Sequence, residues 1–124
     1  MSKDNYITGE INLKPNDINE MIRIINSYEE VKSEYELETK EDLNEEEIKE
    51  KCTIKINGEI IPFDYYHKFD KEGKNKIEYI FNGNLIKANH LFYQCEYFTS
   101  FNLSNFKTQN TTNFRGMFKM LSFN

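Results

Sequence analysis

Short runs of apolar, β-branched and aromatic residues, separated by turn-forming residues, recur through the first two thirds of this chain. Several of them alternate apolar with polar positions, which is the period of a strand with one buried face. The runs are 6–13, 21–26, 53–56, 59–61, 65–69 and 76–81. Strands of this length with turn signals between them predict a small antiparallel β-sheet or a partial β-sandwich over 6–84, preceded by a flexible tail over 1–5.

The clearest local signal is a hairpin. Asn57-Gly58 separates the alternating run 53–56 from the run 59–61, and both residues of an Asn-Gly pair tolerate the positive φ of a tight hairpin turn. Pro62 follows the second run. Since proline cannot donate a backbone hydrogen bond, it favours a strand end or an edge position there.

Between these runs lies an acidic excursion over 29–50. It holds 11 of the 21 acidic residues and three of the 16 basic ones, a local net charge of −8 that leaves +3 for the remainder. Asn44 followed by three glutamates favours a helix start, because a side-chain oxygen and negative charge both suit the free N–H groups there. We predict an exposed segment, part loop and part helix, with any helix confined to about 28–52. Cys52 fits either the end of this helix or the next strand.

The last third of the chain repeats itself. Leu91 and Met117 are 26 positions apart, as are Phe92 and Phe118. A period of about 20–29 residues with apolar positions spaced L-x-x-L-x-L-x-x-N is typical of leucine-rich repeats. The corresponding slots are occupied by Phe98, Phe101, Leu103, Phe106 and Asn110.

The stretch 91–118 resembles the BspA-type leucine-rich repeat. The Leu-Ser-Asn-Phe sequence at 103–106, Thr-Gln-Asn at 108–110 and the Thr112-Asn113 pair carry this resemblance, which covers about a quarter of the chain. Thr111 stands where the family has valine, and Met120-Leu121 stand where it has Gly-Cys.

The resemblance implies a mainly β (α+β) fold in which residues 85–124, one repeat plus a partial second, begin a solenoid after the N-terminal domain. One unit cannot bury its apolar face alone, so we interpret the chain as a truncated array or a fragment. Its last residues, 117–123, are apolar with one charge, which predicts self-association through an uncapped repeat. We also predict one buried ladder of Phe92, Phe98, Phe101, Leu103, Phe106 and Phe118.

Such repeats present a sheet whose outward side chains contact a partner. If Phe101 and Leu103 point inward, Ser100, Asn102 and Ser104 point to the opposite face. These three are small, polar and uncharged, which suits protein or glycan contact. The resulting hypothesis is a non-catalytic protein-interaction module with an unknown protein partner. The alternative is a fragment of a cell-surface adhesin-like repeat protein that binds host protein or glycan.

Composition narrows the partner class and the location. The net charge is −5 and the pI is about 5.1, which argue against nucleic-acid binding. No apolar run is long enough for a membrane span. The N-terminus shows no apolar signal segment, which predicts a cytoplasmic protein, or a surface protein if the true N-terminus lies upstream.

Little in the sequence supports catalysis. His67 and His90 lack partners at metal-ligand spacing, there is no glycine-rich phosphate loop, and the carboxylates of 29–50 fit a solvated face. Cys52 and Cys95 are interpreted as reduced core thiols. We therefore predict no enzyme activity and no cofactor or metal.

Overall fold

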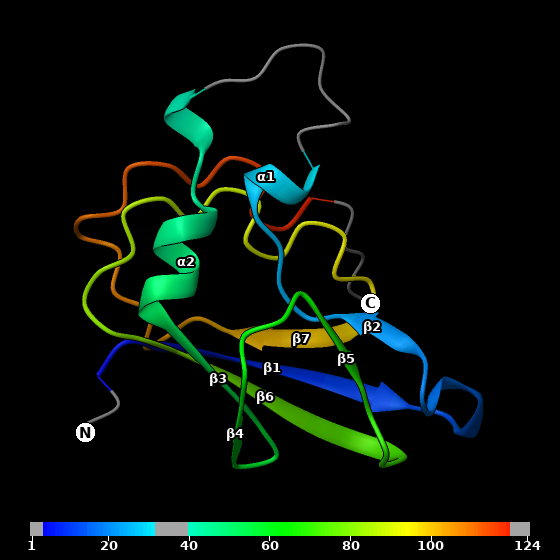
Figure 1. Cartoon of the computed structure of the whole chain (residues 1–124). Helices are drawn as coiled ribbons and strands as arrows, with labels where there is room; N and C mark the ends of the chain where they lie inside the picture. The colour runs from blue at the N-terminus through cyan, green and yellow to red at the C-terminus, as the bar shows by residue number, and fades with distance from the viewer. Residues whose placement is uncertain (1–3, 32–39, 120–124) are drawn as a thin grey trace.

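The computed structural model describes residues 4–31 and 40–119. Within these two ranges, seven strands, two α-helices and two short 3-10 helices follow one another (Figure 1). The strands are β1 (Tyr6–Leu13), β2 (Met21–Arg23), β3 (Cys52–Ile56), β4 (Glu59–Ile61), β5 (Tyr66–Lys68), β6 (Gly73–Phe81) and β7 (Phe98–Asn102). The helices are α1 (Tyr28–Val31) and α2 (Glu45–Lys51), with 3-10 turns η1 (Pro15–Asp17) and η3 (Lys40–Asp42).

Five strands form one antiparallel sheet in the order β4-β3-β6-β1-β7, and β2 pairs with β5 in a second, two-stranded antiparallel sheet. The prediction of a mainly β fold built from antiparallel sheets is confirmed. β1 lies between β6 and β7. Because β7 comes from the repeat-like part of the chain, the large sheet spans the boundary drawn in the sequence between 6–84 and 85–124.

The predicted hairpin is present between β3 and β4. Asn57 and Gly58 have φ angles of 50° and 89°, the left-handed region that this pair tolerates. The side chain of Asn57 also ties the turn to β6. It donates to Asn75 Oδ1 at 2.8 Å and accepts from the N–H of Lys76 at 2.9 Å.

Helix α2 begins after Asn44, as predicted, but for a different reason. The side-chain oxygen of Asn44 accepts the N–H of Tyr28 at 2.9 Å and makes no capping bond. The Glu29 carboxylate instead accepts the N–H groups of Asn44 and Glu45 at 3.0 and 3.1 Å. A carboxylate at this position also complements the helix dipole. Cys52 begins β3 rather than extending the helix, and the middle of the acidic segment, 32–39, lies outside the described residues.

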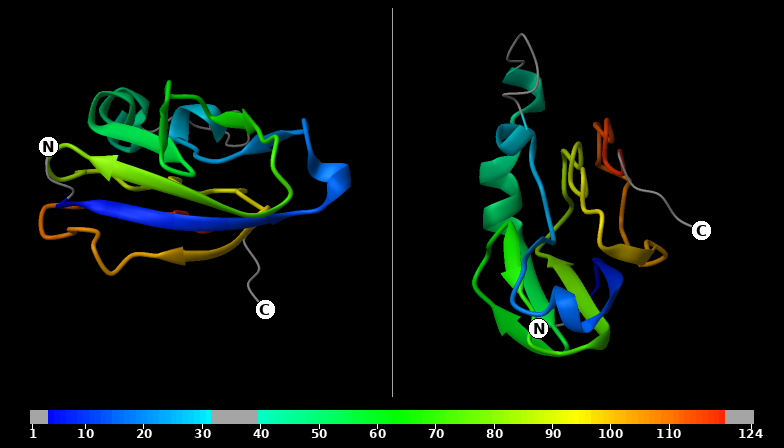
Figure 2. Two further views of the ribbon diagram at one scale, coloured as in Figure 1. Left: turned by 90° about the horizontal axis from the view of Figure 1, so that it is seen from below. Right: turned by 90° about the vertical axis from the view of Figure 1, so that its right-hand side faces the viewer.

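The core lies on one face of the large sheet, beneath α2, the β2–β5 pair and the repeat-like segment (Figure 2). Side chains along β1 and β6 alternate between the two faces of the sheet. Ile7, Ile11 and Tyr79 point into the core, and each is fully buried. Phe92 meets Tyr79 edge-on with ring centroids 5.0 Å apart. This contact joins the sheet to the repeat-like segment through one continuous core.

Residues 86–94 lie alongside 112–119 in a parallel arrangement. Backbone hydrogen bonds join residues 25 or 26 positions apart, in register with the 26-residue sequence repeat. Four N–H groups donate to carbonyl groups 25 positions later, from Ala88, His90, Phe92 and Gln94 to Asn113, Arg115, Met117 and Lys119. The N–H of Thr112 donates to the carbonyl of Ile86, 26 positions earlier. The two layers stand side by side in Figure 2. Two layers do not define a solenoid, so the solenoid stays a prediction. The predicted self-association involves the last residues of the chain, and 120–124 lie outside the described residues.

Buried asparagines fasten the repeat-like segment to the residues before it. Asn26 bonds the carbonyl groups of Leu91 and Tyr93 with its backbone and side-chain N–H groups, each at 2.8 Å. Asn44 donates to the carbonyl of Asn89 at 2.7 Å, and Asn89 donates to that of Asp42 at 2.8 Å. Each amide therefore satisfies a backbone group that would be costly to bury alone.

The N-terminal boundary needs a correction at Asn5, which the sequence interpretation placed in a flexible tail. Asn5 is 4% exposed. It donates to the Gly83 carbonyl at 2.9 Å and accepts the N–H of Lys107 at 2.7 Å, and its own carbonyl accepts the N–H of Phe81 at 2.8 Å. Asn5 thus belongs to the fold and joins the end of β6 to the chain beyond β7.

Candidate interaction surface

β7 is the terminal strand of the large sheet on the repeat side, so only one of its edges has a strand neighbour among the described residues. Its pairing with β1 shifts register between Glu10 and Ile11, a β-bulge that leaves Thr99 as the extra residue. The Thr99 hydroxyl donates to the Glu10 carbonyl at 3.1 Å. Because of the bulge, Phe98 and Phe101 both turn their rings toward Gly9 of β1.

Gly9 is needed for this close approach. A Cβ atom built at Gly9 would lie 2.6 Å from Phe98 Cε2 and 3.1 Å from Phe101 Cε1, and the first distance is shorter than real Cβ contacts allow. The rings of Phe98 and Phe101 therefore stack at 4.6 Å between centroids, with an interplanar angle of 18°. A small residue in the middle of β1 is thus a requirement of the aromatic packing above it.

These two rings belong to a cluster of four. Phe92, fully buried, lies 4.3 Å from Phe101 and 5.7 Å from Phe118 between ring centroids. Phe101 and Phe118 are only half-buried and meet at 5.4 Å. The predicted buried ladder is therefore right for Phe92 and Phe98, and it is incomplete at its outer end.

Leu103 requires a correction. The sequence interpretation placed it inward beside Phe101, but Leu103 is 36% exposed. β7 ends at Asn102, so the alternation of the strand no longer governs the next residue. Phe106, three positions later, is buried against Phe81 with ring centroids 5.5 Å apart, as predicted.

A pocket of about 290 Å³ opens where the half-buried rings meet the free edge of β7. Its lining consists of Thr99, Ser100, Phe101, Leu103 and Phe118. Among the described residues, no charged side chain lines this pocket, and its floor is aromatic. Such a surface favours an apolar side chain of a partner, since burying apolar area is the main favourable term in association.

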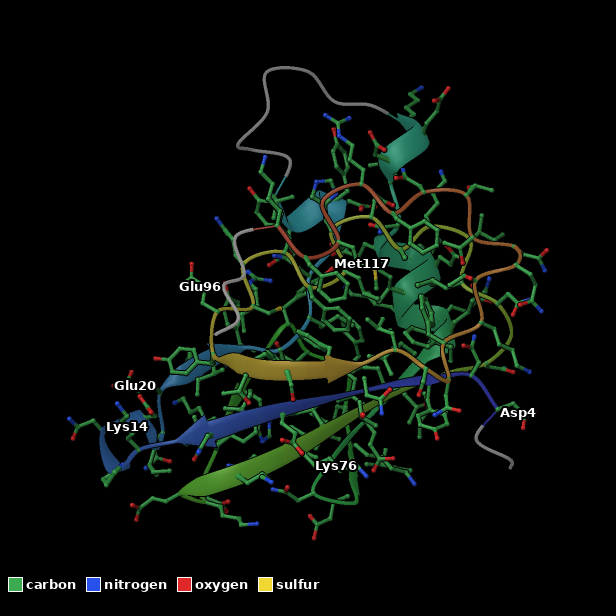
Figure 3. All side chains as sticks on the ribbon, turned by 180° about the vertical axis from the view of Figure 1, so that it is seen from behind. Asp4, Lys14, Glu20, Lys76, Glu96 and Met117 are labelled. Carbon is green, nitrogen blue, oxygen red and sulfur yellow. The ribbon has the colours of Figure 1, made fainter. Side chains whose placement is uncertain are left out.

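The polar residues singled out from the sequence lie at the same edge. Ser100 and Asn102 are exposed and face Glu10 and Thr8 on the outer side of β1, opposite the core. Figure 3 shows β7 lying along β1 at this end of the sheet. Ser104 follows the strand rather than continuing its alternation. Its N–H and hydroxyl groups donate to Asn102 Oδ1 at 3.0 and 2.7 Å, so these two residues form a local turn instead of two independent contact points.

The cysteine and histidine side chains, which were the candidates for chemistry in the sequence, are packed among other side chains of the fold. Cys52 and Cys95 are free, buried thiols, as predicted, and burial raises the pKa of both. Burial lowers the pKa of His67, whose ring packs edge-on against Phe69 at 4.7 Å. His90, 1% exposed, lies against Tyr28 and Tyr93 at 5.6 and 5.4 Å, a burial that its sequence context did not indicate.

Over 4–31 and 40–119 no group of three His, Cys, Asp or Glu side chains is placed to hold a metal ion. Within the same ranges no helix is long and apolar enough to cross a membrane. A larger pocket of about 480 Å³ adjoins α2. Its best-placed carboxylate, Glu47, already accepts from Lys51 at 2.7 Å and from the N–H groups of Ile86 and Lys87 at 2.7 and 3.1 Å. This carboxylate serves to fasten the helix to the repeat-like segment.

No family model matches the chain, and no curated protein or solved structure shows significant similarity to it. Its function must therefore be argued from the geometry of the β7 edge.

Proposed function

We propose that this chain is a non-catalytic protein-interaction module of the leucine-rich-repeat kind, and that its binding surface is the free edge of β7 with the adjoining pocket. The observation that carries the proposal is an uncharged edge strand lying beside an apolar pocket. Free strand edges pair readily with other chains, and proteins usually protect them with charge, proline or covering segments. An edge left open next to an apolar hollow is a feature of interaction sites.

Two further observations support the proposal. The parallel hydrogen bonds between 86–94 and 112–119 follow the spacing of the sequence repeat, and repeat proteins of this kind bind partners through extended surfaces. Ser100 and Asn102 add small polar groups on the outer face of the same strand. They suit a polar rim around an apolar centre, the usual anatomy of a protein interface.

The test compares two doubly substituted chains of equal charge. Ser100→Lys with Asn102→Lys places two cations on β7, and Thr53→Lys with Asn12→Lys places two on exposed positions of β3 and β1. Proteins retained from an extract of the source cells by each immobilised chain are identified by mass spectrometry. We expect a partner that binds the parent chain and the control but not the β7 variant. Equal retention by both variants would contradict the proposal.

A further inference from the structure

Two Asn-Gly pairs follow strands of the large sheet, and the fold holds their asparagine side chains differently. Asn57-Gly58 forms the turn between β3 and β4, and Asn82-Gly83 comes directly after β6. Asparagine followed by glycine is especially prone to spontaneous deamidation, because glycine carries no side chain to obstruct the approach of its main-chain nitrogen. In a folded chain the reaction further requires that the asparagine side chain is free to turn toward that nitrogen.

The side chain of Asn57 is held at both ends. Its Nδ2 donates to Asn75 Oδ1 at 2.8 Å, and its Oδ1 accepts the N–H of Lys76 at 2.9 Å. Asn75 is 1% exposed, and its own Nδ2 donates to two backbone carbonyl groups of the preceding turn at 2.9 and 3.2 Å. These bonds fix the orientation of the amide that Asn57 meets. To reach the Gly58 nitrogen, the Asn57 side chain must first give up two hydrogen bonds.

Asn82 and Gly83 have different surroundings, although both pairs are exposed. Within 4–31 and 40–119, neither the Asn82 side chain nor the Gly83 N–H makes a hydrogen bond. Gly83 has a φ of 83°, and a Cβ atom built on it would meet nothing beyond its chain neighbours within 4 Å. The space around this peptide is therefore open, and the Asn82 side chain has no hydrogen bond to break before it reaches the Gly83 nitrogen.

We propose that Asn82 is a modification site, at which the main-chain nitrogen of Gly83 attacks the side-chain carbonyl carbon of Asn82. The new C–N bond closes a succinimide ring, the bond from that carbon to Nδ2 breaks, and ammonia leaves with the proton that Gly83 loses. Water then opens the ring at either carbonyl group, which gives an aspartyl or an isoaspartyl residue. Nothing is oxidised or reduced, and water is the only co-reactant. This inference does not depend on the proposed interaction function.

The two products differ in their effect on the neighbouring contacts. The aspartyl product keeps the main chain as it is, whereas the isoaspartyl product lengthens the main chain by one carbon. The Gly83 carbonyl accepts Asn5 Nδ2 at 2.9 Å, and the N–H of Asn82 donates to the Lys51 carbonyl at 2.9 Å. A longer link between these two anchors displaces Gly83 from Asn5. The isoaspartyl product therefore weakens the contact that joins the end of β6 to the chain beyond β7.

The test follows both Asn-Gly pairs of the full chain during incubation at neutral pH. Peptide mass spectrometry measures the deamidated fraction at each site and distinguishes isoaspartyl from aspartyl products by fragmentation. In the folded chain we expect Asn82 to react at least about tenfold faster than Asn57, because the hydrogen bonds that hold Asn57 raise the barrier to attack. In urea, where both side chains are free, the two rates should converge. Isoaspartyl should form at 82, since direct hydrolysis of the side chain would give aspartyl alone.

Two variants separate the reaction from its consequence. Asn82→Gln keeps a side-chain amide but requires a larger ring, so deamidation at 82 should slow by at least about tenfold while Asn57 reacts as in the parent. Asn82→Asp reproduces the aspartyl product. The N–H of Lys107 donates to Asn5 Oδ1 at 2.7 Å. Its hydrogen exchange should be at least about tenfold faster in the aged, deamidated chain, purified by anion exchange, than in Asn82→Asp.

Four outcomes would contradict the proposal. Equal rates at Asn57 and Asn82 in the folded chain would show that the hydrogen bonds at Asn57 have no effect. If Asn82 reacted in urea but stayed intact in the folded chain, the fold would protect this site as well. Aspartyl alone at 82 would exclude the succinimide. Equal exchange at Lys107 in the aged chain and in Asn82→Asp would mean that the longer main chain is accommodated without loss of the Asn5 contact.

Discussion

The two edges of the five-stranded sheet are built differently. β4 has three residues, includes the charged Glu59 and is followed directly by Pro62. β7 has five residues, none charged, and lies beside an apolar pocket. Short length, charge and proline are the devices by which proteins protect a strand edge from pairing. β4 has all three and β7 has none, so the two ends of one sheet differ in their capacity for strand addition.

The two edge strands also differ in how much they contribute to the core. β4 contributes little to the core, with Ile60 68% exposed and Ile61 half-buried. β7 contributes Phe98 and Phe101 to the cluster of four phenylalanines and depends on a glycine in the neighbouring strand. The β7 edge is therefore held by shape-specific aromatic contacts, while β4 is held mainly by its hairpin. Five predictions follow from this asymmetry and from the groups beneath the two edges, from the largest expected effect to the smallest.

Phe92→Ala should cause the largest loss of stability, because Phe92 is fully buried and touches the sheet and both repeat layers. We expect a loss of about 3–5 kcal/mol in the free energy of unfolding, measured by urea titration. Ile61→Ala on β4 should cost only about 1 kcal/mol. Comparable losses for the two substitutions would show that the edges are equally anchored.

Gly9→Ala should destabilise the β7 side through overpacking. The added methyl group meets the Phe98 ring at 2.6 Å, and forcing such rings apart costs about 1–3 kcal/mol. Thr8→Ala, at the adjacent position on the outer face, should change stability by no more than about 0.5 kcal/mol. Amide hydrogen exchange should show the loss of protection in β7 before β4. An unaltered exchange pattern in Gly9→Ala would mean that the rings have room to move.

Alkylation of the two cysteines measures local opening on the β4 side and on the β7 side separately. Cys52 lies in β3 beside β4, and Cys95 lies in the repeat-like segment just before β7. Burial raises the pKa of each thiol above its ordinary 9.0. Both should resist alkylation at neutral pH. Gly9→Ala should accelerate labelling of Cys95 more than that of Cys52, by about tenfold for each 1.4 kcal/mol of local opening, as followed by peptide mass spectrometry.

The same thiols predict the direction of a pH effect. Since their pKa values are higher in the folded state, their contribution to stability is complete below the ordinary thiol pKa and is lost as the pH rises above it. Alkaline denaturation that begins well below pH 9.0 would have to be caused by the ionisation of groups other than these two thiols.

Leu103→Asp should have the smallest effect on stability. Leu103 is 36% exposed at the pocket rim, so the new carboxylate stays hydrated, and we expect a loss below about 1 kcal/mol. The sequence pattern placed Leu103 in the buried ladder, where an unpaired carboxylate would cost more. A melting temperature far below that of the parent would restore the earlier interpretation.

Local signals in the sequence predicted local structure well. The strand at 6–13 coincides with β1, and Asn57-Gly58 forms the expected turn. These features depend on side-chain alternation and on the tolerance of two residues for positive φ, both of which are properties of a few neighbouring positions. Ser100 and Asn102 face outward for the same reason.

Features that depend on distant residues were missed. No local pattern indicates that β7 pairs with β1, or that Glu29 rather than Asn44 satisfies the first N–H groups of α2. The pocket needs Phe118 from the second repeat unit beside Phe101 from the first. The 26-residue period contained that information, but only the hydrogen-bonded register showed which side chains meet.

The central position of β1 has a consequence for the time course of synthesis. β1 leaves the ribosome well before both of its neighbours, which begin at Gly73 and Phe98, and Asn5 finds its last partner at Lys107. At about 5–20 residues per second, translation leaves this strand unpaired for several seconds, with Ile7 and Ile11 uncovered. Pairing over such separations also slows folding of the complete chain. During that interval the apolar face of β1 is open to pairing with other unpaired strands.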